Sequence, residues 1–493
     1  MAEQKLLFHP SLALFTDFYE LTMAYGYWKA GIQDKEAVFH LTFRNNPFQG
    51  GFAVACGLEY VIDYLKHFRF ADDDLNHLAS FHGIDGKPIF NSEFLKYLSG
   101  FRFECDLDAV PEGTVVFPHE PLVRVKGPLI QSQILESVFL NFINFQTLIA
   151  TKAARVCLAA EGDDVVEFGM RRAQGIDGAL AASRASYIGG CSSTSNVLAG
   201  KLFGIPVKGT HAHSWVMAFG DELEAFRAYA KAIPNNCIFL VDTYDSIDGI
   251  NRAIHVAKEM RAEGHKLIGI RLDSGDLAYL SRLARKMLDD AGFPNVKVVV
   301  SNELDEHTIA SVKHEGGKVD IWGIGTKLVT AHDDPALGGI YKLSAIRNRN
   351  EKWQYKVKIS EQTIKINNPG IHQVRRYFKA GENIADVIYD EGTDLSKGCT
   401  IVDQTDMTRQ KIIEASTSFS DLLVPVFRSG KCVYEMPSIR DIRIKVHDEL
   451  ERFHSGIKRF VNPHRYPAGI EKSLFDLKTN LVLKTKKLHQ AAV

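Results

Sequence analysis

The sequence has few cysteines, and none of them lies in a short paired motif. Seven cysteines are scattered over 493 residues without a CxxC pair. An odd, unclustered set argues against a disulfide framework and against a cysteine-based zinc site, and it fits a reducing compartment. We therefore expect a cytoplasmic protein whose thiols stay reduced.

The sequence also has no excess of either charge and no long apolar run. It contains 59 Lys and Arg against 60 Asp and Glu, a net charge of -1, which offers no overall attraction to nucleic acid. No uninterrupted apolar stretch reaches the roughly 18–20 residues that a membrane helix needs. The first residues lack the basic segment and cleavage site of a signal peptide. We expect no nucleic-acid and no membrane partner, and we interpret the basic C-terminal tail as a solvated helical face.

A strand-then-helix pattern repeats between about residues 165 and 330. Short β-branched runs end in Gly, Asp, Ser or Thr and are followed by helical stretches, at intervals of about 30 residues. In the stretch 274–292, Ser274 is placed to cap a helix and Gly292 to end it. This is the pattern of βα units around a parallel sheet. The runs are VVEFGM (165–170), GIPVKGT (204–210), CIFLVDTY (237–244), KLIGIRLDSGD (266–276), VKVVVSNELD (296–305) and VDIWGIGTKLVT (319–330).

Such a sheet can close into a barrel or stay open and doubly wound. A barrel brings the carboxyl ends of all its strands to one face, where the chemistry then gathers. The ends of the predicted strands are rich in reactive residue types, which favours an α/β fold with a (βα) barrel. These end residues are Glu167, Arg171, Thr210, His211, His213, Asp242, Arg271, Asp273, Ser274, Asp276, Asn302, Asp305 and Gly325.

The regions on either side of the barrel pattern differ from it. The N-terminal region mixes helical and strand-like stretches, and the C-terminal region alternates like antiparallel strands before a helical end. We predict an N-terminal α/β domain over residues 1–150, the barrel with the active site over 151–345, and C-terminal strands and helices over 346–493. The last segment is expected to complete or cover the other two.

Two histidines in GTHAHS (209–214) are candidates for chemistry. His211 and His213 lie two residues apart just after a predicted strand, so they are candidate metal ligands, acid–base groups or phosphate acceptors. No further His or carboxylate cluster stands at ligand spacing beside them, which disfavours a metal. A satisfied loop histidine is the plain alternative.

The motif RLDSGD (271–276) places an arginine and two carboxylates at a helix start. Capping explains Ser274 and Asp276. It does not explain Arg271 and Asp273, and Asp273 is a candidate for binding ribose hydroxyls or Mg²⁺.

Two other motifs point to phosphate and to a ring. In WGIGTKLVT (322–330) the glycines allow backbone N–H groups to approach a phosphate, although a tight turn would also require them. In EFGMRRAQG (167–175), Phe168 can stack on a ring and Arg171 can pair with an anion, unless they are a core residue and a solvated arginine. A barrel face of cations, glycines, aromatics and carboxylates predicts an enzyme acting on a phosphorylated sugar with an aromatic or acidic co-substrate.

Several long, ordered blocks of the sequence resemble the nicotinate phosphoribosyltransferase family. The resemblance runs from near the N-terminus to about residue 345 and weakly beyond. It implies a type II phosphoribosyltransferase fold, an irregular α/β barrel with an N-terminal α/β domain and further C-terminal elements. It also implies a homodimer in which each site is completed by the N-terminal domain of the other subunit. The blocks are TDFYELTMAYGY, FRNNPFQGGFAVACGLEYVI, EGTVVFPHEPLVRV, EFGMRRAQGIDGALAASRASYIGGCSSTSNVLAG, GTHAHSWVMAF, RLDSGDLAYL and GIGTKLVT.

The resemblance also implies a reaction. Nicotinate and 5-phosphoribosyl 1-pyrophosphate (PRPP) would give nicotinate mononucleotide and pyrophosphate, with Mg²⁺ as cofactor and ATP hydrolysed through a phosphohistidine. His213 resembles the phosphorylated histidine, and with Asp273 it is the expected catalytic pair. Tyr19 and Phe168 resemble the residues that sandwich the pyridine ring, and Thr210 and Arg271 those that contact nicotinate.

The remaining expected roles concern phosphate and metal. Arg171 and the run Gly323-Ile324-Gly325-Thr326 resemble PRPP phosphate ligands, and Asp273 and Asp305 resemble the groups that hold ribose or Mg²⁺. Arg271 gives a physical reason to prefer a carboxylate to an amide. The alternatives are a nicotinamide or quinolinate phosphoribosyltransferase, or a relative that binds PRPP or nucleotides without catalysis.

Overall fold

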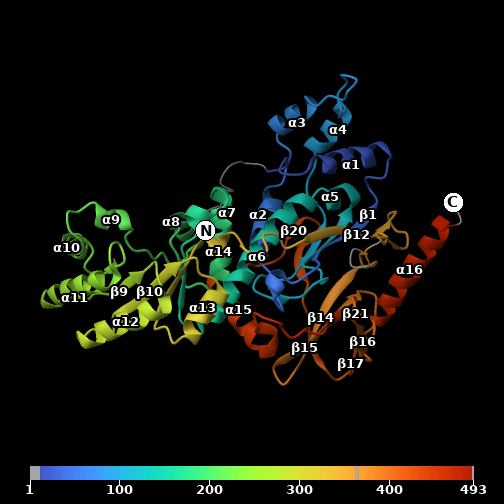
Figure 1. Ribbon diagram of the computed structural model, residues 1–493. Coiled ribbons are helices and arrows are strands. Elements are labelled where there is room, and N and C mark those ends of the chain that lie inside the picture. The colour runs from blue at the N-terminus through green and yellow to red at the C-terminus, as the bar shows by residue number, and fades with distance from the viewer. Residues whose placement is uncertain (1–11, 361, 363–365, 491–493) are drawn as a thin grey trace. The chain divides into compact units, whose positions relative to one another are not determined.

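The chain forms two compact units (Figure 1). The computed structural model describes residues 12–360, 362 and 366–490. Unit 1 consists of the chain up to Leu148 and from Ala336 onward, and unit 2 of Ile149–Pro335. The grouping differs from the three consecutive segments predicted above. Strands that follow Ala336 pair with strands of the N-terminal segment, so the two ends of the chain share one unit.

Unit 2 is built on six parallel strands, which confirms the predicted α/β barrel-type sheet. The hydrogen-bonded order is β7-β6-β11-β10-β9-β8, a curled half-barrel in which the strands alternate with helices. Five of the six β-branched runs supply its buried strands, as in β10, where four consecutive residues are buried. The sixth run, 204–210, is not a strand and forms only an isolated bridge between Val207 and Thr194, and β7 lies outside the predicted runs. The strands are β6 (Asp164–Glu167), β7 (Ser193–Thr194), β8 (Ile238–Leu240), β9 (Gly269–Leu272), β10 (Lys297–Asn302) and β11 (Ile321–Ile324).

Aspartates start three of the helices that follow these strands. Asp245, Asp276 and Asp305 each accept a hydrogen bond from a first-turn backbone N–H. The prediction that Ser274 caps its helix is wrong. Asp276 is the cap, and the Ser274 hydroxyl donates to Asp242 instead. The helices of unit 2 are α7 (Gly175–Ile188), α8 (Val197–Phe203), α9 (His213–Met217), α10 (Glu222–Ala232), α11 (Ser246–Ala262), α12 (Leu277–Asp290), α13 (Glu306–His314), α14 (Thr326–Val329) and the 3-10 turn η2 (Met170–Arg172).

Unit 1 contains two larger sheets. The seven-stranded sheet has the order β13-β12-β1-β5-β3-β19-β20, and its central strand pairs are antiparallel. Its strands are β1 (Glu36–Phe43), β3 (Asp106–Ala109), β5 (Val123–Pro128), β12 (Gly339–Arg347), β13 (Gln354–Tyr355), β19 (Val424–Arg428) and β20 (Lys431–Cys432). The six-stranded sheet has the order β17-β16-β21-β15-β14-β18, formed by β14 (His372–Lys379), β15 (Glu382–Asp390), β16 (Cys399–Val402), β17 (Gln410–Ile413), β18 (Ser418–Asp421) and β21 (Ala468–Glu471). β2 (Ala53–Val54) pairs with β4 (Val115–Val116).

Unit 1 also contains helices, and one long helix leads from it into unit 2. The stretch Leu129–Ala160 is long and apolar enough to cross a membrane by length and composition, yet 67% of its most apolar part is buried inside the protein, as in a core helix. The chain passes into unit 2 within this stretch. The elements are α1 (Phe18–Lys29), η1 (Pro47–Gln49), α2 (Leu58–His67), α3 (Asp72–Ala79), α4 (Ser92–Ser99), α5 (Leu129–Gln133), α6 (Glu136–Ala160), α15 (Ile439–Glu451), η4 (Ser455–Lys458) and α16 (Lys472–Gln490).

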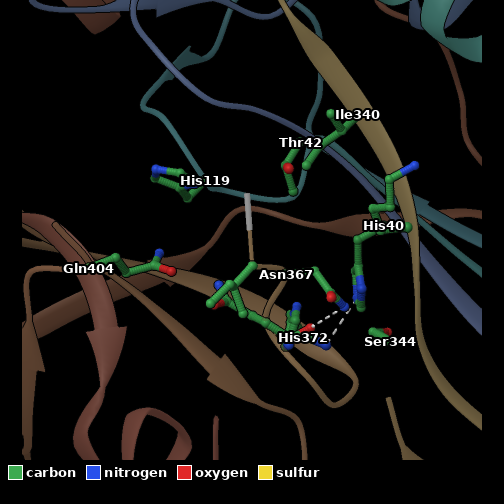
Figure 2. Close-up of a pocket in the computed structure, with 11 residues that line it drawn as sticks. His40, Thr42, His119, Ile340, Ser344, Asn367, His372 and Gln404 are labelled. Carbon is green, nitrogen blue, oxygen red and sulfur yellow. Dashed lines mark hydrogen bonds between the residues drawn. The ribbon is translucent and has the colours of Figure 1, made fainter. Parts of the chain in front are cut away.

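Two buried histidines stack beside a small cavity in unit 1 (Figure 2). The rings of His40 and His372 lie 4.2 Å apart, and the His372 backbone N–H donates to His40 Nε2 at 3.1 Å. Burial, together with the nearby Arg124, lowers the pKa of both imidazoles, to about 4 for His372. Both rings are therefore neutral in the folded protein at pH 7.

Acid is expected to destabilise unit 1 through this pair. In the unfolded chain each imidazole binds a proton below about pH 6.5, whereas the folded protein resists protonation down to about pH 4 for His372. The contribution of the two neutral imidazoles to the free energy of unfolding is thus fully present above about pH 6.5. It is lost as the pH falls, by up to about 1.4 kcal/mol per pH unit for each histidine. Melting temperatures at pH 7, 6 and 5 measure this slope. A His372→Asn variant should show a shallower slope, and an unchanged slope would contradict the assignment.

Candidate active site

The carboxyl ends of five neighbouring strands of unit 2 adjoin. In the parallel register, Ser301 of β10 stands beside Gly323 of β11, and Ile324 of β11 stands beside Glu167 of β6. On the other side β10 pairs with β9, whose Arg271 is the partner of Leu240 in β8. Residues at these ends and in the loops after them therefore meet at one edge of the sheet.

Arg271 is the centre of the polar contacts at this edge. Its Nε donates to the Ser301 hydroxyl at 2.7 Å, its Nη1 to the Thr210 hydroxyl at 3.0 Å and its Nη2 to Asp273 Oδ1 at 2.9 Å. The guanidinium carbon lies 5.6 Å from the centre of the Phe168 ring. The arginine is thus fixed in orientation, with its charge held beside an aromatic face.

Asp273 is held ionised next to this arginine. Burial raises the pKa of its carboxyl, but the Ser301 hydroxyl and the Arg271 guanidinium outweigh burial and keep the pKa below its usual range. Its backbone N–H donates to Asp242 Oδ2 at 2.8 Å, which fixes the turn after β9. The second carboxylate oxygen, Oδ2, lies 3.7 Å from His213 Nε2 and faces the partly exposed side of the site.

The two histidines of GTHAHS have different surroundings. His211 is buried against the Tyr229 ring, 4.8 Å between centres, and its Nε2 accepts the Leu240 backbone N–H at 3.1 Å. Burial lowers the pKa of His211 to about 4. The side chain of His213 is 40% exposed, with Nδ1 3.2 Å from the Thr243 hydroxyl. His211 is therefore a packed, satisfied residue, whereas His213 is open to a reactant.

Phe168 and the glycines of β11 form the apolar side of the site. The Phe168 backbone N–H donates to Ile324 O at 2.7 Å, and the ring covers Gly323 so closely that a Cβ there would lie 2.6 Å from two ring carbons. Gly325, the N-cap of α14, has more room, because its Cβ would be 3.7 Å from the nearest atom. The two glycines are thus under different constraints.

Charged residues around α14 are partly engaged with each other. Asp305 Oδ1 accepts the backbone N–H and the hydroxyl of Thr308, and Oδ2 pairs with Lys327 Nζ at 2.7 Å. Burial raises the pKa of Asp305, but Lys327 and Thr308 outweigh it and bring the pKa to about 2. Thr326 donates to Glu303 at 3.1 Å, and Arg171 lies exposed in η2. Arg171 is therefore accessible from solvent.

This arrangement suits a planar, acidic ring beside a phosphorylated sugar. An aromatic face and a fixed guanidinium can take an aromatic carboxylate, and an ionised aspartate with a nearby imidazole can bind hydroxyls or a phosphorylated group. Backbone N–H groups around Gly325 are available to an anion without a side chain in the way. This edge of the sheet can therefore support the transfer of a phosphorylated sugar to a planar, acidic ring.

Comparison with known sequences decides the family. The family models for nicotinate phosphoribosyltransferase (NAPRTase) match the chain as N-terminal domain over residues 14–144, as family over 164–381 and as C-terminal domain over 371–478. The nicotinate phosphoribosyltransferase of Bacillus subtilis is 44% identical over 486 residues, covering 97% of this chain and 96% of that protein. The chain belongs to the nicotinate phosphoribosyltransferase family.

Solved structures agree with this family and its fold. The crystal structure of human nicotinic acid phosphoribosyltransferase superposes with a TM-score of 0.82 at 31% identity, covering 94% of this chain and 99% of that one. The nicotinate-nucleotide pyrophosphorylase of Pyrococcus furiosus, with a TM-score of 0.68, 22% identity and coverage of 89% and 95%, supports the fold alone. The predicted fold class, a type II phosphoribosyltransferase barrel with additional elements, is confirmed.

Most of the site residues predicted for the nicotinate phosphoribosyltransferase family lie at this edge of unit 2. Thr210, Arg271 and Asp273 are joined by direct hydrogen bonds, and Phe168 and His213 lie next to them. Arg171, Gly323, Gly325, Thr326 and Asp305 lie at the ends of β6, β10 and β11 or in the loops after them. Tyr19 is in α1 of unit 1, so its place beside Phe168 stays a prediction, as do the roles of the others.

Two hydroxyls at the site were missed by the sequence reasoning. Ser301 bridges Arg271 and Asp273, to which it donates a short hydrogen bond, and Thr243 contacts His213. The only available signal was position, because each is a small polar residue at or just after a strand end, like the residues that were singled out. Asp242 was among the strand-end residues, and it accepts hydrogen bonds from the Asp273 backbone N–H and the Ser274 hydroxyl.

The residues fit magnesium only as a partner of substrate phosphates. Among the described residues no group of three or more His, Cys, Asp or Glu side chains is arranged to hold a metal ion. Mg²⁺ commonly binds through one or two carboxylates together with phosphate oxygens and water. Asp273 Oδ2 would supply one such carboxylate oxygen, whereas both oxygens of Asp305 are engaged by Lys327 and Thr308.

Proposed function

We propose that this protein forms nicotinate mononucleotide and pyrophosphate from nicotinate and PRPP, in a step of NAD biosynthesis coupled to ATP hydrolysis. The supporting observation is the fixed guanidinium of Arg271. Three of its five N–H groups donate to described residues, which leaves two for a substrate carboxylate beside the Phe168 ring. Nicotinate has a planar ring that can stack on Phe168 and a carboxylate in the same plane that can pair with Arg271. The sequences of the relatives point the same way.

The proposed mechanism is mainly one of positioning and charge stabilisation. Phe168 and Arg271 hold the pyridine ring so that its nitrogen faces C1 of PRPP. As pyrophosphate leaves, C1 becomes electron-poor, and the carboxylate of Asp273 stabilises the developing positive charge and orients the ribose hydroxyls. Arg171 and the backbone around Gly325 bind phosphate oxygens. A magnesium ion held by Asp273 and the pyrophosphate would neutralise charge on the leaving group.

We propose that ATP acts through His213. A neutral imidazole attacks the γ-phosphate, the bond to ADP breaks, and the phosphorylated ring adds negative charge next to the PRPP site. The added negative charge would attract the cations that bind PRPP, such as Arg171. The contacts of His211, which engage its Nε2 and bury its ring, favour His213 as the acceptor.

We also propose a cytoplasmic homodimer. Each unit exposes a group of large apolar side chains. In unit 1 they lie in and just before α1, and they are Phe15, Phe18, Tyr19 and Met23. In unit 2 they are Met170, Ile176, Val197 and Leu198. Surfaces of this kind are typical of protein contacts. Light scattering after size-exclusion chromatography should give twice the chain mass of 55.1 kDa, and a monomer at assay concentration would contradict the proposal.

The substrate assignment is tested by direct competition between ring acids and amides. Purified protein with PRPP, Mg²⁺ and ATP would be offered nicotinate, nicotinamide and quinolinate separately, and mononucleotides would be separated by chromatography. Nicotinate is expected to be used at least tenfold more efficiently than the others, because only it presents one carboxylate in the ring plane to Arg271. Turnover of nicotinamide in preference to nicotinate would reject the proposal. Absence of any product would favour a non-catalytic relative.

A further inference from the structure

The Phe168 ring rests directly on the backbone of β11. A Cβ built on Gly323 would lie 2.6 Å from both Cδ2 and Cε2 of the ring and 3.3 Å from the Ser301 Cβ. Real Cβ atoms do not approach other carbons so closely. The backbone of Gly323 does not itself require glycine, since its φ is not in the left-handed region. The ring, rather than a turn, therefore excludes a side chain at this position.

The turn that carries Phe168 is fixed from its other side by a buried carboxylate. Glu167 is 1% exposed and accepts hydrogen bonds from the Gly169 backbone N–H, from Ser183 Oγ at 2.9 Å and from Thr194 Oγ1 at 2.5 Å. The two hydroxyls come from α7 and β7. The carboxylate thus ties the residues before and after Phe168 to two other elements.

Gly169, the residue after Phe168, is also confined. A Cβ there would lie 2.6 Å from Val329 Cγ2 in α14. Together with the bond from the Phe168 N–H to Ile324 O, this packing leaves the backbone little freedom. The orientation of the ring is consequently determined by groups that do not themselves face the substrate side.

We infer that Gly323 and Glu167 are positioning residues that set the depth and tilt of the Phe168 ring, and so the space for the substrate ring that stacks on Phe168 beside Arg271. This inference rests on the proposed function, and it names a different role for Gly323 than phosphate binding. The absence of a side chain at Gly323 lets the Phe168 ring lie against the backbone of β11, and Glu167 fixes the turn that carries the ring. A change at either position alters the binding of the pyridine acid and leaves the phosphate contacts in place.

A Gly323→Ala variant separates the two roles of this glycine. The added methyl group would displace the Phe168 ring from its present position, so the KM for nicotinate is expected to rise about tenfold or more, while the KM for PRPP changes less than about twofold. The matched control is Gly178→Ala in α7, where a Cβ meets nothing within 4 Å. A rise in the PRPP KM with an unchanged nicotinate KM would overturn the inference in favour of a phosphate role.

A double-mutant cycle tests whether the effect passes through the ring. In a Phe168→Leu background the smaller side chain has room for the methyl group, so adding Gly323→Ala should change the nicotinate KM less than about twofold. If Gly323→Ala alone does not fold, the Phe168→Leu/Gly323→Ala protein is expected to recover the melting temperature of Phe168→Leu. An additive loss in the double variant would overturn the inference.

Glu167→Gln provides an independent probe of the turn. It removes the charge that accepts three hydrogen bonds, so it is expected to raise the nicotinate KM several-fold with little change in the PRPP KM. Equal changes in both KM values would indicate a general structural role and would overturn the inference for this residue. Failure of the proposed function is distinguishable, because it would appear in the unmodified protein as an inability to use nicotinate.

Discussion

An Arg271→Gln variant is expected to lose about 10²–10³-fold in kcat/KM for nicotinate. The substitution removes a charge-assisted pair with the substrate carboxylate and leaves that carboxylate in a partly desolvated site, at a cost of about 3–4 kcal/mol. It also releases the Asp273 carboxylate from its cationic neighbour at 2.9 Å. Steady-state rates with nicotinate and nicotinamide, measured on the same preparation, give the result directly.

The discrimination between acid and amide is the decisive part of that measurement. An amide has no negative charge for the guanidinium, so the variant should lose more activity with nicotinate than with nicotinamide. Arg271→Lys keeps the charge but cannot reach Ser301, Thr210 and Asp273 together. Its kcat/KM for nicotinate should therefore lie between those of the unmodified protein and Arg271→Gln. The matched control is Arg282→Gln on α12, whose guanidinium donates to the Glu315 carbonyl away from these groups. Unchanged nicotinate turnover in Arg271→Gln would remove Arg271 from the site.

The strand-and-helix pattern predicted that these residues lie together, although the predicted strand before Thr210 forms only an isolated bridge at Val207. In a parallel sheet the carboxyl ends of the strands meet at one edge, so Thr210, Arg271 and Asp273 could be expected to meet, and they are joined by hydrogen bonds. The runs of β-branched residues give that periodicity locally, within single segments of chain. Local patterns of this kind can be read without any knowledge of distant contacts.

Contacts between distant segments could not be read in the same way. β1 pairs along its length with β12, and no feature of either strand specifies the other as its partner. The same limit explains the error at Ser274. Ser274 and Asp276 both have side chains that can cap a helix, and the choice depended on Asp242, a residue from the neighbouring strand end that takes the Ser274 hydroxyl.

The local sequence also could not distinguish the two glycines of GIGT or the two histidines of GTHAHS. Gly323 and Gly325 stand in one motif, but only the first lies under the Phe168 ring. His211 and His213 stand two residues apart, yet the first turns toward Tyr229 and the Leu240 N–H while the second stays open. In both cases a tertiary neighbour assigns different tasks to residues that look equivalent in the sequence.

A His213→Asn variant is expected to lose the phosphorylation of the protein by ATP, with PRPP-dependent ATP hydrolysis falling by at least about 10³-fold. Without a nucleophilic nitrogen no phosphoryl group can be accepted. Formation of nicotinate mononucleotide without ATP should persist, because Arg271, Phe168 and Asp273 are unchanged. The KM for PRPP should then no longer fall when ATP is added. Retention of radioactive phosphate from γ-labelled ATP in the denatured protein is the direct measurement.

The control for this variant is His211→Gln. Its amide oxygen can still accept the Leu240 N–H, so phosphorylation should persist, with at most a loss of stability from the changed packing against Tyr229. The physical reason to expect His213 is its pair of neighbours. Thr243 orients the ring at Nδ1, and Asp273 Oδ2, 3.7 Å from Nε2, stabilises the positive charge that the ring gains as it attacks phosphorus. Labelled phosphate that stays in His213→Asn but disappears in His211→Gln would reverse the assignment.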